Sequence, residues 1–231
     1  MPDQGQVASP RPSKVRFPTP GELERMKSSP RIHGWTLLVW VILLSGCLGT
    51  SQPFKDDFSD PASGWGAASH ETYVRGYQQG RYLFQIDVPR WFVWATSGHN
   101  YADVRLSAVV RSSGPSDDHY GLLCRYDEEQ FYYFALSSDG YYAIFRRDEE
   151  GELLPLTGRA MLRSSAIHMD GTDNRIVAVC EGSTLTLSAN GEVIAQVDDD
   201  ELVKGDVGMA AGTVSAGGAT VWFDDFEARE P

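Results

Sequence analysis

The chain has 231 residues, of which 42% are hydrophobic, 11% aromatic and 23% charged. These fractions are typical of a folded globular protein and exclude a wholly disordered chain, a collagen and a protein with many membrane spans. The whole chain carries a formal charge of −12, and because residues 1–47 hold six basic and three acidic residues, residues 48–231 carry −15. A body this acidic repels phosphate backbones, which argues against nucleic-acid binding.

An apolar run of ten residues, 35–44, lies near the N-terminus, and Lys27 and Arg31 precede it. As a helix this run would span about 15 Å, roughly half of the ~30 Å hydrocarbon core of a bilayer, so it is too short for a stable transmembrane helix. A basic segment followed by an apolar core of this length is typical of a signal peptide.

The residues Leu44-Ser45-Gly46-Cys47 end this apolar core. Small residues directly before a cysteine resemble the lipobox of bacterial lipoproteins. The resemblance implies cleavage before Cys47 and lipidation of that residue, and two or more acyl chains give stable membrane attachment. The alternative is a short uncleaved anchor in which Cys47 has no role. We expect an exported protein that is held on a cell-envelope membrane through lipid on Cys47.

The neighbouring segments follow from the same prediction. Residues 26–46 are expected to form the lipoprotein signal peptide, and residues 47–53 the lipidated N-terminus with a short linker. A start at Met26 would give a signal peptide of ordinary proportions. Residues 1–25, which are rich in Pro, Ser and other polar residues, are therefore expected to be a disordered extension or a misassigned translation start.

From Phe54 onward apolar and polar residues alternate, as they do over 104–110. A period of two predicts strands with one buried face. Asn190-Gly191 and Asp139-Gly140 lie between such segments and predict tight hairpins, because these residue types tolerate positive φ. About ten to twelve strands, spaced about eight to twelve residues apart, favour one all-β antiparallel sandwich with little helix.

Several short motifs give this pattern a likeness to a known family. They are FKDDFSDP (54–61) with Gly64-Trp65, YGLLCRY (120–126), FYYF (131–134), LTLSANG (185–191) and VWFDDF (221–226). Their order resembles the concanavalin A-like lectin/glucanase jelly rolls, and it looks closest to bacterial envelope modules near the 3-keto-disaccharide hydrolase group. The resemblance covers residues 54–229 and implies two curved antiparallel sheets, with the first and last strands side by side.

Two cysteines remain in the predicted sandwich, Cys124 and Cys180. Both lie in predicted strands, on the faces that carry apolar neighbours, and an exported protein is in a setting that permits disulfides. A bond between them would stabilise the fold by about 4 kcal/mol in the chain-entropy model. The alternative is two free thiols in the core, where cysteine behaves as a small hydrophobe.

The resembled superfamily contains glycoside hydrolases, whose E-x-D-x-x-E motif is absent from this sequence. Asp127 and Glu129 form the densest pair of carboxylates, and on an extended strand they would lie about 7 Å apart, within the range of an inverting pair. They fall, however, where one predicted strand turns into the next, and carboxylates at such a tip are solvated. The sequence therefore favours a domain that is not an enzyme.

Metal sites have weaker support in the sequence. Some jelly rolls of the resembled superfamily bind a structural calcium near the joined terminal strands, and calcium takes hard oxygen ligands. Here the resemblance points to Asp56, Asp57, Asp224 and Asp225, with acids that merely end strands at the surface as the alternative. No cofactor is required, and the histidines show no metal-ligand spacing.

Aromatic residues are the best candidates for binding a ligand. The segment 90–94 (RWFVW) and the pairs Tyr132-Tyr133 and Tyr141-Tyr142 place rings on both faces of their strands. Sugars stack on such rings while nearby polar groups supply hydrogen bonds. The predicted ligand-binding residues are Trp94, Tyr133 and Tyr142, with Arg125 and Arg146 as hydrogen-bond donors. The alternative is that these rings belong to the core, because sandwich cores are rich in aromatic residues and both sheets are partly covered.

The function predicted from these features is a membrane-anchored envelope lipoprotein whose concanavalin A-like domain binds carbohydrate or another envelope polymer without catalysis. A protein-interaction or spacing module is the alternative, because one superfold hosts many functions. A glycan hydrolase ranks third, since no motif supplies its pair of carboxylates.

Overall fold

The computed structural model describes residues 52–169 and 171–231. The signal peptide, the start at Met26 and the lipidation of Cys47 lie outside these residues. Within them no helix is long and apolar enough to cross a membrane.

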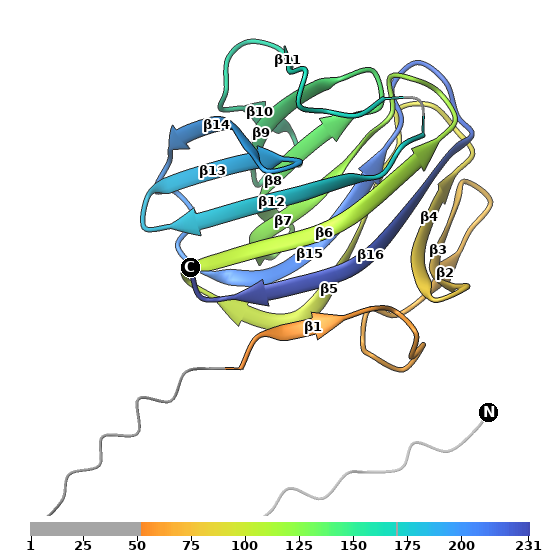
Figure 1. The fold of residues 1–231 in the computed structure, drawn as a ribbon, viewed down its shortest axis with the longest axis horizontal. Helices are drawn as coiled ribbons and strands as arrows, with labels where there is room; N and C mark the ends of the chain where they lie inside the picture. The colour runs from red at the N-terminus through yellow and green to blue at the C-terminus, as the bar shows by residue number, and fades with distance from the viewer. Residues whose placement is uncertain (1–51, 170) are drawn as a thin grey trace, which may run out of the picture. The chain divides into compact units, whose positions relative to one another are not determined.

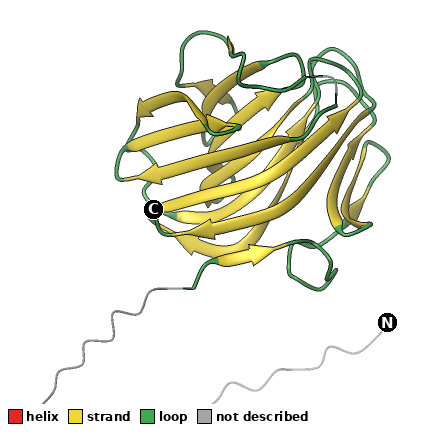
Figure 2. Ribbon diagram, in the orientation of Figure 1, coloured by secondary structure: helices red, strands yellow, loops and turns green. Residues whose placement is uncertain are grey.

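The described residues form sixteen strands and no helix, as Figures 1 and 2 show. The strands are β1 (Phe54–Asp56), β2 (Ala68–Ser69), β3 (Tyr73–Gln78), β4 (Arg81–Ile86), β5 (Phe92–Tyr101), β6 (Val104–Ser113), β7 (His119–Asp127), β8 (Gln130–Ser137), β9 (Tyr141–Arg147), β10 (Leu153–Pro155), β11 (Leu162–Arg163), β12 (Asn174–Glu181), β13 (Thr184–Ala189), β14 (Glu192–Asp198), β15 (Gly205–Gly212) and β16 (Ala219–Arg229).

These strands make two antiparallel sheets. The nine-stranded sheet has the order β14-β13-β12-β6-β16-β4-β3-β2, and β1 pairs with β16. The seven-stranded sheet has the order β10-β9-β8-β7-β15-β5, and β11 pairs with β9. Phe54 lies opposite Ala228, so the first and last strands are neighbours, as Figure 1 shows. The predicted all-β jelly-roll sandwich is confirmed.

Two hairpin turns show how local sequence shapes the sheets. Asn190 and Gly191 join β13 to β14 with φ values of 51° and 91°, the positive values that the hairpin prediction requires. Glu128 and Glu129 join β7 to β8 with φ values of 46° and 74°. Residues with a Cβ rarely adopt this region, so the Glu128-Glu129 turn is held in an unfavourable conformation.

The core lies between the two sheets and is built from alternate residues of each strand. Tyr82, Phe84 and Phe223 fill it from the nine-stranded sheet, and Leu122 and Phe134 from the seven-stranded sheet; all five are fully buried. Burying such side chains stabilises a fold by about 1.5–3 kcal/mol each. The other face of each sheet points away from this core, where it can contact water, a segment of the chain that covers it, or a partner.

A disulfide crosses this core. Cys124 of β7 is bonded to Cys180 of β12, 56 residues later, and both residues are fully buried. Because β7 and β12 belong to different sheets, the bond joins the two layers covalently.

The segment after β1 is fixed by a buried carboxylate. Asp56, 8% exposed, accepts hydrogen bonds from the Trp65 indole Nε1 at 2.8 Å and from the Phe58 backbone N at 2.7 Å. The Trp65 ring then packs against Phe226 of β16, with ring centroids 4.8 Å apart. The FKDDF and GW motifs of the sequence therefore serve the joining of the first and last strands.

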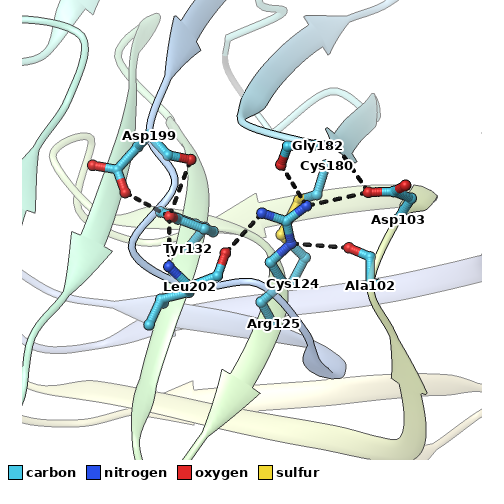
Figure 3. Close-up of a disulfide and its surroundings, with 9 residues drawn as sticks. All are labelled: Ala102, Asp103, Cys124, Arg125, Tyr132, Cys180, Gly182, Asp199 and Leu202. Carbon is cyan, nitrogen blue, oxygen red and sulfur yellow. Dashed lines mark hydrogen bonds and ion pairs between the residues drawn. A yellow bond between two sulfur atoms is a disulfide. The ribbon is translucent and has the colours of Figure 1, made fainter.

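Arg125 is the largest fully buried side chain of the described residues, with 2% exposure. Its Nε donates to Ala102 O at 2.9 Å, and its terminal nitrogens donate to Leu202 O at 2.7 Å and Gly182 O at 2.8 Å. A terminal nitrogen also pairs with the Asp103 carboxylate at 3.3 Å. Figure 3 shows how this one guanidinium ties three separate connections to β7.

A β-bulge explains why Arg125 points inward. The register between β7 and β8 shifts between Cys124 and Asp127, and Arg125 has a φ of 56°. Strict alternation would turn Arg125 away from the core, because Cys124 before it faces inward. The extra residue re-aims the side chain, which is a common effect of bulges.

Replacing Arg125 by Met keeps much of the side-chain volume but removes every donor. Three backbone carbonyls would then lose their partner, and each buried unsatisfied polar group costs about 1–3 kcal/mol. We expect the free energy of unfolding in urea to fall by at least about 3 kcal/mol relative to wild type.

The control is Arg163→Met at an exposed position of β11. This change should alter the free energy of unfolding by no more than about 0.5 kcal/mol. Equal stability of the two variants would contradict the structural role given to Arg125.

Candidate functional site

The seven-stranded sheet carries aromatic side chains on the face that points away from the nine-stranded sheet. We call this set the outer aromatic face. It consists of Phe92, Trp94, Tyr126, Phe131, Tyr133 and Phe145. These residues alternate along β5, β7, β8 and β9 with residues of the main core, such as Val93 and Tyr132. Phe131 and Tyr133 are fully buried, while the other four remain partly exposed.

The rings meet across the sheet. Phe92 and Tyr133 have centroids 5.1 Å apart, and Trp94 and Phe131 5.7 Å, although β15 and β7 lie between their strands. Small residues make this possible, because β15 presents Gly208 to this face. A Cβ on Gly208 would lie 2.3 Å from a backbone oxygen of β5, so that position requires glycine. The rings thus form one packed cluster, in which the partly exposed Phe92, Trp94, Tyr126 and Phe145 pack against the fully buried Phe131 and Tyr133.

A cation lies over this surface. The Arg147 guanidinium carbon is 5.1 Å from the centroid of the Trp94 ring and 5.8 Å from that of Phe131. A terminal nitrogen of Arg147 donates to the backbone oxygen of Glu129 at 2.6 Å and pairs with its carboxylate at 3.5 Å. Cation–π contacts of this kind contribute about 0.5–2 kcal/mol.

Carboxylates surround this end of the face. The two hairpin tips at residues 127–129 and 148–152, which we call the acidic rim, hold seven acidic side chains. The tips are neighbours, since Arg147 bonds to Glu129, and a Cβ on Gly151 would lie 2.8 Å from a terminal nitrogen of Arg147. Asp127, Glu128 and Glu149 are exposed.

His119 stands at the other end of the face. Its Nδ1 lies 3.0 Å from the Tyr133 hydroxyl, and its ring stacks on Phe92 with centroids 5.6 Å apart. Burial lowers the pKa of His119 to about 4, and the nearby charge of Asp117 only partly opposes this shift. The imidazole is therefore neutral at pH 7.

The structure places the residues predicted to bind a ligand in different environments, some on the outer aromatic face and some in the interior. Trp94 is partly exposed on the outer aromatic face, and Tyr133 lies on the same face but is fully covered. Tyr142 points into the main core. The four hydrogen bonds that Arg125 donates go to three backbone carbonyls and Asp103, so Arg125 has a structural role in place of the predicted ligand contact.

Arg146 is likewise engaged within the protein. Its terminal nitrogen donates to Asp199 at 2.7 Å, and the Tyr132 hydroxyl donates to the same carboxylate at 2.5 Å. Burial alone would raise the pKa of Asp199, but these two hydrogen bonds outweigh it and hold that pKa below its usual value. The network fastens the connection between β14 and β15 to the seven-stranded sheet.

Three of the four aspartates predicted to bind calcium are engaged by other residues, and the backbone N of the fourth, Asp225, donates to Asp224 at 2.9 Å. Asp56 holds Trp65 and Phe58, Asp57 accepts from Ser59 at 2.6 Å, and Asp224 pairs with Arg81 at 3.4 Å. Asp56, Asp57 and Asp225 do line one hollow of about 660 Å³ beside β1. Within residues 52–169 and 171–231, however, no three His, Cys, Asp or Glu residues form a group that could hold a metal ion.

Carboxylates suited to glycoside hydrolysis are not found on the part of the outer aromatic face that the structure describes. Hydrolysis needs two of them on either side of the scissile bond. The acid in contact with this face is Glu129, whose carboxylate is paired with Arg147. Asp127 and Glu129 lie at an exposed hairpin tip, as the sequence predicted.

Known proteins match this chain in fold only. No protein-family model and no curated protein matches the sequence. The carbohydrate binding module CBM66 from Bacillus subtilis has a TM-score of 0.54 at 12% identity, over 79% of this chain and 98% of that chain. A Bacillus subtilis protein of unknown function with a galectin-like fold has a TM-score of 0.58 at 10% identity, over 77% and 94%.

A third match is a glycoside hydrolase family 16 endo-glucanase from Bacteroides ovatus, whose structure holds a bound compound named G4G3G-2F-DNP. Its TM-score is 0.51 at 11% identity, over 76% of this chain and 99% of that chain. Identities this low establish a shared architecture and nothing more. The domain therefore shares the two-sheet jelly-roll fold of these proteins, and one fold can serve binding modules and enzymes alike.

His119, which is partly buried, gives a prediction about pH. Its folded-state pKa of about 4 lies below the ordinary 6.5, so between these values the unfolded chain binds a proton that the folded chain does not. Stability that depends on neutral His119 is therefore lost as the pH falls. We expect the Tm of wild type to drop more steeply than that of His119→Phe between pH 6.5 and 4 in calorimetry.

The matched control is His70→Phe, at an exposed position where the histidine ring contacts Tyr73. Its Tm should follow the wild-type slope. Parallel curves for wild type and His119→Phe would show that His119 is not held neutral.

Proposed function

We propose that this protein is a non-catalytic carbohydrate-binding module of the cell envelope, anchored by lipid on Cys47, and that the glycan lies on the outer aromatic face. The protein part of this proposal concerns residues 54–229. The anchor rests on the apolar run 35–44 and the small residues before Cys47.

The observation that carries the proposal is the partly exposed ring set of Trp94, Phe92, Tyr126 and Phe145 on one sheet face. Rings in a row on a rigid sheet offer the apolar face of a sugar a stacking surface at little entropic cost, because the sheet already holds them. The carbohydrate-binding module and the endo-glucanase named above support the proposal through their fold, since one is a module that binds carbohydrate and the other a glucanase, and both have the same architecture.

A protein-binding role is the second candidate. Leu154 and Leu162, 38% and 45% exposed, lie on the segment that follows β9, and Val193 of β14 is 62% exposed. Such residues suit a protein partner when they form one patch of several hundred Å². Leu154 and Leu162 lie on two strands that pair with β9, whereas Val193 belongs to the other sheet, so the three do not form a patch on one sheet and we rank this role below glycan binding.

The test is binding of the described domain to a panel of insoluble and soluble polysaccharides, with wild type, Trp94→Ala and Trp222→Ala compared. Trp222 of β16 is a matched control, because it is also partly exposed but belongs to the nine-stranded sheet. Loss of stacking at Trp94 should weaken binding at least about tenfold, a change of about 1.4 kcal/mol. Trp222→Ala should bind like wild type.

Two results would overturn this proposal. One is no binding to any polysaccharide by the folded wild-type domain. The other is equal affinity of wild type and Trp94→Ala, which would place the ligand on another surface.

A further inference from the structure

The acidic rim bears on the kind of glycan that the outer aromatic face accepts. We propose that the ligand is a cationic glycan, namely a polysaccharide of amino sugars with free amino groups. This inference rests on the proposed function and adds the substrate class to it.

Charge is the first argument. Residues 48–231 carry −15, and seven of their acidic side chains gather in the acidic rim. In the structure as described, Asp127, Glu128, Glu149 and Glu150 take part in no ion pair. A field of one sign beside a binding surface attracts ligands of the opposite charge and repels those of the same charge.

Three basic residues on this surface do little to cancel that field, and the exposed Arg90 and Arg159, two residues from Phe92 and Met161, are further cations outside the acidic rim. Arg147 is 15% exposed in its side chain and is already paired with Glu129. His119 is neutral at pH 7 for the reason given above. Arg163 lies opposite Tyr141, at the end of β9 away from the acidic rim. An anionic polysaccharide would therefore meet uncompensated carboxylates beside the rings.

The rings themselves are the second argument. Trp94 and Phe131 already hold a guanidinium within 6 Å of their centroids. Because Arg147 makes this contact and Phe131 is fully buried, a ligand would stack on the rings left partly exposed, which are those of Phe92, Trp94, Tyr126 and Phe145. An amino sugar combines the two needs, because its C–H face stacks on a ring while its ammonium group, a few bonds away, reaches the carboxylates of the rim.

Charge and ring stacking together thus identify the class of ligand. A basic peptide would satisfy the carboxylates, but its flexible side chains lack the flat C–H face of a sugar. A neutral glycan would satisfy the rings and leave the rim unused. The amino-sugar polymer uses both parts of the surface.

The experiment compares two polymers that share one backbone. Chitosan has free amino groups, and chitin has the same β-linked glucosamine units with the amines acetylated. We expect the wild-type domain to bind soluble chitosan oligomers at least tenfold more tightly than chitin oligomers of equal length in calorimetry. The affinity for chitosan should fall as salt is raised, and alginate, an anionic polysaccharide, should not bind.

Variants separate the rim from the general charge of the domain. Glu128→Asn with Glu129→Gly removes two carboxylates and supplies residues that suit the positive φ of this turn, so the hairpin should be kept. The control pair, Glu181→Gln with Glu192→Gln, removes two exposed acids from the nine-stranded sheet. We expect the first pair to weaken chitosan binding about fivefold or more and the control pair to leave it unchanged.

The outcomes distinguish this inference from the proposed function. Equal affinity for chitin and chitosan, or equal loss in both double variants, would overturn the cationic class while glycan binding stands. Binding of polylysine as tight as chitosan, together with chitosan binding that Trp94→Ala does not weaken, would reduce the interaction to charge attraction and overturn the inference. Binding of no polysaccharide at all would remove the proposed function itself.

Discussion

The buried guanidinium of Arg125 is the contact on which the arrangement of this domain depends most. A charge taken out of water is costly unless its donors find partners. Here those partners are carbonyls of three different connections, so satisfying the charge fixes the chain between β5 and β6, between β12 and β13, and between β14 and β15. The disulfide one residue away joins the sheets at the same place. The end of the sandwich next to this pair is thereby rigid, and the seven-stranded sheet can present its outer aromatic face without support from a ligand.

Sequence patterns were sufficient for the fold. Alternation predicts the longer strands, Asn190-Gly191 predicts its hairpin, and the paired DDF motifs agree with the neighbouring β1 and β16. The expected ten to twelve strands are fewer than the sixteen of the described residues, because strands of two or three residues such as β2 and β11 are too short to show a period. The candidate site was harder to predict, because alternation assigns residues to two faces but does not say which face is covered. Tyr133 and Trp94 thus have the same pattern, yet one is fully buried and the other is partly exposed. The prediction that Arg125 contacts a ligand is wrong because a bulge breaks the alternation of inward and outward residues. The one feature of the sequence that indicates its burial is that this long charged residue follows a cysteine of the core.

In the described part of the chain, the outer aromatic face carries rings where glycoside hydrolysis would need a pair of carboxylates. A hydrolase must keep its sheet face open and line it with carboxylates of different pKa. In the described part of this chain the face is filled by rings that touch each other across four strands, and its carboxylates stand outside, at hairpin tips. The same arrangement leaves the partly exposed rings of Phe92, Trp94, Tyr126 and Phe145 beside a negatively charged border.

The pairing of β1 with β16 bears on the distance between the sandwich and the membrane. Phe54, the first residue of β1, comes seven residues after Cys47. A fully extended stretch of that length spans at most about 25 Å, which is less than the thickness of a bilayer with its headgroups. Under the proposed lipid attachment the sandwich would therefore lie within one domain diameter of the lipid surface. It could bind only those polymers that reach within this distance of the membrane.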